Sequence, residues 1–117
     1  MSPAGASILV VEDDPSLRLV CRVNLELESF RVREAEGVDE ARAAVAAERP
    51  ALVFLDLHLG AGASDAFLEE LRAEGIPVVL VSGTVDVAEY VGRASEVMPK
   101  PFDPADLVAA AHRHAAS

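Results

Sequence analysis

The sequence has few aromatic residues, a single cysteine and no long apolar run. Only 4% of its 117 residues are aromatic, and tryptophan is absent, which favours an aliphatic α/β core over an aromatic-rich sandwich. Because Cys21 is alone, a disulfide framework is excluded, which fits a reducing compartment. No segment approaches the roughly 20 apolar residues of a membrane span, and no signal peptide is recognisable. We therefore expect a cytoplasmic protein that does not act on membranes.

Basic residues are also scarce. The chain has 20 acidic and 10 basic residues, a formal net charge of −10, and Lys100 is its only lysine. Such a surface repels nucleic acid as well as anionic membranes, so we expect no direct binding to either. The acidic residues are spread along the chain, which argues against a disordered tail. Length and the absence of a linker or repeat predict that residues 1–117 form one domain, with no output domain in this chain.

Five apolar segments of strand length alternate with helical patterns. The predicted strands cover residues 7–12, 31–35, 51–56, 76–82 and 96–98. The predicted helices begin at Pro15 after an Asp14 cap, at about Val38, near a Ser64 cap, at about Val85 and at Asp103-Pro104. Regular alternation with short loops predicts a doubly wound parallel sheet with helices on both faces.

The first predicted helix carries apolar residues at helical spacing, namely Leu17, Val20, Val23 and Leu27. Cys21 lies in the same amphipathic segment. We therefore interpret Cys21 as a buried structural thiol and not as a redox site.

Acidic residues stand at the ends of two predicted strands. Asp13 and Asp14 follow the first strand, and Asp56 ends the third. Because carboxyl ends of parallel strands meet at one edge, about 4.8 Å apart for neighbours, the three carboxylates are expected to converge. Carboxylates that close repel one another unless a cation joins them. A small site of oxygen ligands suits Mg²⁺, so we predict a magnesium site at this edge.

The other strand ends carry groups that suit phosphoryl chemistry. With the metal bound, Asp56 would attack a phosphorus atom, Lys100 would pair with one phosphoryl oxygen, and Ser82 would donate a hydrogen bond to another. Each acidic residue also has a simpler interpretation, as a helix cap, a solvated loop residue or a loop cap. Suitable groups at four of five strand ends favour the functional interpretation.

In order and spacing, these residues resemble the receiver domain of bacterial two-component response regulators. The resemblance covers essentially the whole chain and rests on Asp13, Asp14, Asp56, Ser82 and Lys100-Pro101-Phe102. It implies a flavodoxin-like (βα)5 fold with strand order 2-1-3-4-5. It further implies Mg²⁺-dependent transfer of a phosphoryl group to Asp56 from a phosphohistidine on a sensor histidine kinase or phosphotransfer protein. The domain would catalyse its own phosphorylation and dephosphorylation, yet act mainly as a signalling module that binds a downstream protein.

The resemblance also implies details of the site. The metal would be held by Asp13 or Asp14, by Asp56 and by the backbone carbonyl of His58. The peptide bond between Lys100 and Pro101 would be cis, an arrangement that X-Pro bonds tolerate.

The chain departs from the family pattern near its last two strands. Val97 stands where the family usually has an aromatic residue, three positions before the lysine. The segment from Ser82 to Lys100 is about four residues shorter than usual, which predicts a fourth helix one turn short. A face reduced in this way buries less than the roughly 1,200 Å² that stable interfaces need. We therefore expect the phosphorylated chain to remain monomeric.

Two other classes of protein share part of this pattern. A pseudo-receiver would act as a constitutive interaction module without taking phosphate, but the complete set of site residues argues against it. An aspartate-nucleophile phosphatase would need a second aspartate two residues after Asp56, where this chain has His58. Whether the receiver acts alone or belongs to a longer protein stays open.

Overall fold

The computed structural model describes residues 6–57, 63–83, 90 and 92–115. Its strands are β1 (Ser7–Val11), β2 (Arg31–Ala35), β3 (Leu52–Asp56), β4 (Val78–Ser82) and β5 (Glu96–Pro99). They form one parallel sheet in the order β2-β1-β3-β4-β5. The helices are α1 (Pro15–Leu27), α2 (Val38–Ala47), α3 (Ala63–Ala73) and α4 (Pro104–Ala115). The predicted fold class and strand order are confirmed, whereas most of the predicted short helix over 85–92 lies outside the described residues.

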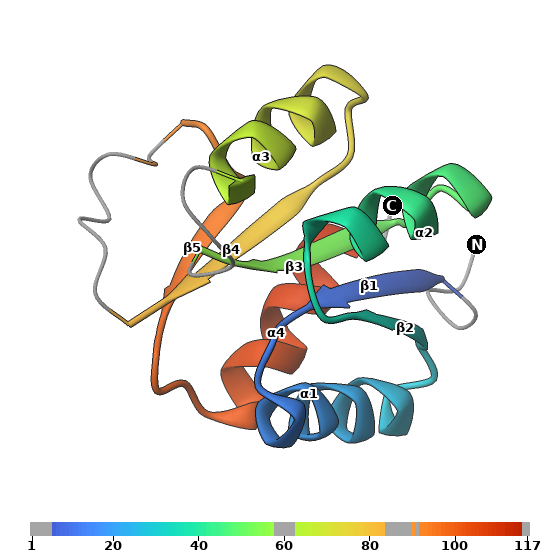
Figure 1. Cartoon of the computed structure of the whole chain (residues 1–117). Coiled ribbons are helices and arrows are strands. Elements are labelled where there is room, and N and C mark those ends of the chain that lie inside the picture. The colour runs from blue at the N-terminus through green and yellow to red at the C-terminus, as the bar shows by residue number, and fades with distance from the viewer. Residues whose placement is uncertain (1–5, 58–62, 84–89, 91, 116–117) are drawn as a thin grey trace.

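Two helices cover each face of the sheet (Figure 1), α1 and α4 on one side and α2 and α3 on the other. Alternate strand residues fill two aliphatic cores: Ile8, Val10, Leu52, Phe54, Val79 and Val81 toward α1 and α4, and Leu9, Val11, Val53, Leu55, Val78 and Leu80 toward α2 and α3. Because β1, β3 and β4 are buried on both faces, their sequences are nearly continuous apolar runs.

Helix α1 begins as the sequence predicts. Oδ1 of Asp14 accepts hydrogen bonds from the amides of Ser16 at 2.9 Å and Leu17 at 3.4 Å, and Pro15 occupies the first helical position. None of the helices in the described ranges has the length and apolar character that crossing a membrane requires.

The buried face of α1 differs from the predicted apolar stripe. The fully buried residues are Cys21 and Leu25, which confirms the buried thiol, and Leu17 is half-buried against the same core. The large aliphatic residues left exposed are Leu19 (51%), Val20 (42%), Val23 (45%) and Leu27 (76%), which we call the α1 stripe. The helical period is therefore predicted correctly, but three of the four residues expected at the core face solvent.

Helix α3 begins at Ala63, two residues before the Asp65 start that a Ser64 cap predicts, so the N-cap prediction for Ser64 is wrong. Ser64 lies inside the first turn, and its buried hydroxyl donates a 2.9 Å hydrogen bond to the backbone carbonyl of Asp56. Phe67, Leu68 and Leu71 are buried, as their spacing predicts. Gly75 closes the helix with φ of 73°, a left-handed conformation that glycine adopts without strain.

Candidate metal and phosphoryl site

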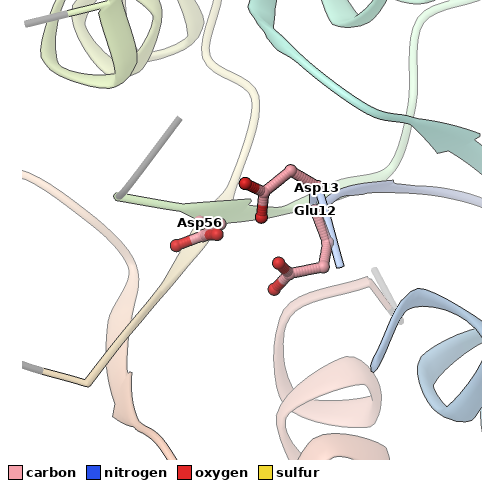
Figure 2. Close-up of side chains that lie close together, drawn as sticks. All are labelled: Glu12, Asp13 and Asp56. Carbon is pink, nitrogen blue, oxygen red and sulfur yellow. The ribbon is translucent and has the colours of Figure 1, made fainter. Parts of the chain in front are cut away.

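The carboxyl ends of β1 and β3 lie side by side. Val11 pairs with Leu55, so Glu12 leaves β1 next to Asp56, the last residue of β3. One carboxylate oxygen from each of Glu12, Asp13 and Asp56 lies within 4.8 Å of the other two, and the three side chains point toward a common space (Figure 2). Glu12 and Asp56 are buried and Asp13 is exposed. This all-oxygen donor set, open on one side, fits a hard divalent cation such as Mg²⁺.

The structure brings Asp13 and Asp56 together as predicted but leaves Asp14 outside the acidic cluster. The Asp14 carboxylate is directed to the first turn of α1, where it caps the helix. Glu12 takes the place expected for Asp14, and the sequence-based prediction of the site does not include Glu12. A signal was present, because Ile8, Val10 and Glu12 alternate toward one face of the sheet, as Leu52, Phe54 and Asp56 do.

The backbone carbonyl of His58, expected from the family resemblance to bind the metal, lies outside the described residues. The same holds for the loop residues that follow it, up to position 62. The donor set that the structure describes therefore consists of side chains from the ends of β1 and β3.

Lys100 joins the acidic cluster from the end of β5. Its Nζ lies 2.9 Å from Oε1 of Glu12 and 3.5 Å from Oδ2 of Asp56. Its amide donates to the carbonyl of Ser82 at 2.8 Å, which fixes the ends of β4 and β5 side by side. Ser82 is buried at this edge. The peptide bond between Lys100 and Pro101 is cis, which confirms the expectation from the resemblance.

Burial and charge shape the acid–base properties of the site. Burial raises the pKa of Glu12 to about 7, although hydrogen bonds from Lys100 and from the Asp14 amide, at 3.1 Å, act against it. For Lys100, burial lowers the pKa, but the Glu12 hydrogen bond and the charge of Asp56 outweigh burial, so its pKa is raised. Lys100 is therefore a cation at neutral pH, and Glu12 exchanges a proton near neutral pH.

The thiol of Cys21 lies beneath the same edge but takes no part in this chemistry. Burial raises the pKa of Cys21 to about 12, so the thiol stays protonated and is a poor nucleophile.

The fold and the site together define a doubly wound α/β protein with a carboxylate and lysine site at the carboxyl edge of its sheet. A family model described as the response regulator receiver domain matches residues 8–112. The chain therefore belongs to the receiver domains of two-component response regulators.

Individual proteins agree with this assignment. The chain is similar to the KDP operon transcriptional regulatory protein KdpE of Escherichia coli K12, with 31% identity over 120 residues, which cover 95% of this chain and 53% of KdpE. It is 36% identical over 107 residues to the DNA-binding response regulator MtrA of Mycolicibacterium smegmatis, covering 87% of this chain and 47% of MtrA. The chain thus spans about half the length of these two curated relatives. The crystal structure of the NtrX receiver domain from Brucella abortus superposes with a TM-score of 0.84 at 31% identity, covering 94% of this chain and 98% of that one.

Proposed function

We propose that this receiver accepts a phosphoryl group on Asp56 in a Mg²⁺-dependent reaction. The observation that carries the proposal is the convergence of Glu12, Asp13 and Asp56 beside Lys100. Asp13 and Asp56 would hold the cation, with Glu12 at its edge. The cation, when bound, would neutralise charge on the carboxylates and on the transferred group.

The residues of the chain divide the remaining chemistry. A carboxylate oxygen of Asp56 forms a bond to phosphorus as the bond from phosphorus to the imidazole nitrogen of the donor breaks. Lys100 Nζ lies 3.5 Å from Oδ2 of Asp56. On phosphorylation it would replace its ion pair with Glu12 by an ion pair with a phosphoryl oxygen. The hydroxyl of Ser82, at the end of β4, donates to a second oxygen. Because each group is fixed at a strand end, little reorganisation is needed.

The donor in this proposal is a sensor histidine kinase or a phosphotransfer protein in the cytoplasm. The α1 stripe is a candidate docking surface for this donor protein. Single exposed aliphatic residues are ordinary on a protein surface, whereas four on one face of one helix suggest a contact surface. Helix α1 starts directly after the acidic cluster, so a donor helix laid along the stripe would carry its histidine to Asp56.

The experiment is phosphorylation with acetyl phosphate, with and without Mg²⁺, followed by mass spectrometry of the modified peptide. Modification is expected on Asp56. It should be absent without Mg²⁺ and absent in Asp56→Asn. Asp13→Asn is expected to lose it as well. Asp14→Asn is a matched control because asparagine caps helices as well as aspartate does. A loss of modification in Asp14→Asn, with Asp13→Asn active, would overturn the assignment of the ligands.

A further inference from the structure

The first turn of α3 makes polar contacts that the phosphoryl chemistry does not use. Ser64 and Asp65 are consecutive residues of this turn; the side chain of Ser64 is hydrogen-bonded to Asp56, and that of Asp65 to Tyr90. We propose that Ser64 and Asp65 transmit the state of Asp56 to Tyr90, and that activation weakens the hydrogen bond between Asp65 and Tyr90. The inference rests on the proposed function, because it takes occupation of Asp56 as its input.

The contact on the input side is buried. The hydroxyl of Ser64 is 2.9 Å from the backbone carbonyl of Asp56, and both residues are about 2% exposed. Breaking a buried hydrogen bond is costly because its polar groups cannot turn to water instead. A backbone shift at the phosphoacceptor therefore moves the first turn of α3 with it.

The contact on the output side involves Tyr90, which is buried in the core between the sheet and the α2–α3 layer. Its hydroxyl donates to Oδ1 of Asp65 at 2.7 Å. Arg93 lies over its ring, 4.9 Å from the centroid, and pairs with Glu69 at 3.2 Å. Asp65 and Glu69 are one turn apart and share a face of α3. The amide of Arg93 donates to the carbonyl of Tyr90 at 2.9 Å, so these two residues are linked to each other, and each contacts α3 through its side chain.

Arg93 lies three residues before β5, the strand that ends at Pro99, directly before Lys100. The amide of Ser95 donates to the carbonyl of Val78 at 2.9 Å, so the chain joins the sheet two residues after Arg93. Val97 in β5 has no ring that could rotate in response to the site. The phenol of Tyr90 offers instead a polar contact that is either made or broken, which is the kind of two-state element that coupling requires.

Tyr90 is also its own reporter, because the chain has one tyrosine and no tryptophan. A phenol that donates to a carboxylate emits weakly, since the excited phenol loses its proton to that carboxylate. The bond to Asp65 is already formed at 2.7 Å, so a change on activation means its loss and a rise in emission.

The test adds beryllofluoride and Mg²⁺ to the intact chain and records tyrosine emission, while fluorine NMR detects the bound beryllofluoride. Wild type is expected to show a rise in emission on binding. Asp65→Ala should emit strongly from the start and show no further rise. Ser64→Ala should start like wild type, bind beryllofluoride and show a reduced rise, with circular dichroism verifying the fold. Asp39→Ala, which removes an exposed aspartate from the first turn of α2, is the matched control and should respond like wild type.

The outcomes separate this inference from the proposed function. Bound beryllofluoride without a change in Tyr90 emission in wild type would overturn the transmission through α3 and leave Asp56 as the acceptor. An unchanged rise in both Ser64→Ala and Asp65→Ala would overturn it as well. Absence of bound beryllofluoride in wild type would overturn both.

Discussion

Helices α1 and α3 both begin beside the acidic cluster, yet they use their surfaces in opposite ways. Helix α1 buries Cys21 and Leu25 and leaves the α1 stripe in solvent. Helix α3 buries its large apolar residues, and its first turn is bonded to Asp56 and Tyr90. One helix therefore has apolar surface left for another protein, whereas the other is committed to contacts within the domain. In our proposals, α1 binds the phosphoryl donor, and α3 transmits the state of Asp56 to Tyr90.

The largest expected effect tests where each helix contributes to stability. Phe67→Ala in α3 should lower the free energy of unfolding by about 3–5 kcal/mol, and Leu25→Ala in α1 by about 2–5 kcal/mol, because each leaves a cavity in the core. Leu27→Ala, on the α1 stripe, should change it by less than about 0.5 kcal/mol. Urea unfolding monitored by circular dichroism measures all three. A cost for Leu27→Ala equal to that for Leu25→Ala would remove the contrast between the two faces of α1.

The second effect concerns Glu12, at the site where both helices begin. Its pKa is about 7 in the folded protein and about 4.5 in the unfolded chain. Between these values the native state holds a proton that the unfolded chain has lost, so stability should fall as pH rises from about 4.5 to 7. Each pKa unit is worth about 1.4 kcal/mol, so the loss amounts to at most about 3.5 kcal/mol.

Melting curves across this pH range, recorded without divalent cations, measure the effect. Glu12→Gln should flatten the dependence, and Glu36→Gln, which removes an exposed acid, should leave it as in wild type. Saturating Mg²⁺ should reverse the slope, since cation binding displaces the proton from the acidic cluster. An equal slope in wild type and Glu12→Gln would show that Glu12 does not carry the raised pKa.

The third effect tests the α1 stripe as a docking surface. Val23→Ser should slow phosphotransfer from a protein donor by roughly tenfold, which corresponds to about 1.4 kcal/mol of lost interaction. Phosphorylation by acetyl phosphate should be unchanged, because a small donor needs no helix surface. A matched substitution at an exposed position of α3, Ala66→Ser, should affect neither reaction. Equal slowing with both donors for Val23→Ser would point to damage at the site instead of lost docking.

The sequence predicts the sheet better than it predicts the helix faces. Strands β1, β3 and β4 are buried on both sides, so their apolar runs identify them without any knowledge of packing. Helix α1 has apolar residues on two faces, and which face is buried depends on how it packs against the sheet and α4, which spacing alone does not contain.

The sequence predicts most residues of the candidate site but assigns one of its carboxylates to the wrong residue. Asp13, Asp56 and Lys100 meet as their strand-end positions predict. The acidic cluster contains Glu12 in place of the predicted Asp14. The Asp14 carboxylate, directly before Pro15, accepts hydrogen bonds from the helix amides, whereas the longer Glu12 side chain reaches Lys100. The sequence pattern predicts Ser64 as a helix cap. Its actual hydrogen-bond partner is the Asp56 carbonyl at the end of β3, and the pattern does not show that this carbonyl lies within reach.

The smallest effect compares how the two helices end. Ser29 after α1 has φ of 72°, and Gly75 after α3 has φ of 73°, with the same pair of backbone hydrogen bonds closing each helix. A serine is strained in this left-handed conformation and glycine is not, so Ser29→Gly should stabilise the domain by about 0.5–1 kcal/mol. Gly75→Ser should cost a similar amount, because an added Cβ would meet only the Arg49 guanidinium at 3.6 Å, an ordinary contact. Thermal unfolding of the two variants should therefore move in opposite directions from wild type, and a shift of both in the same direction would show that the two helix ends are not equivalent.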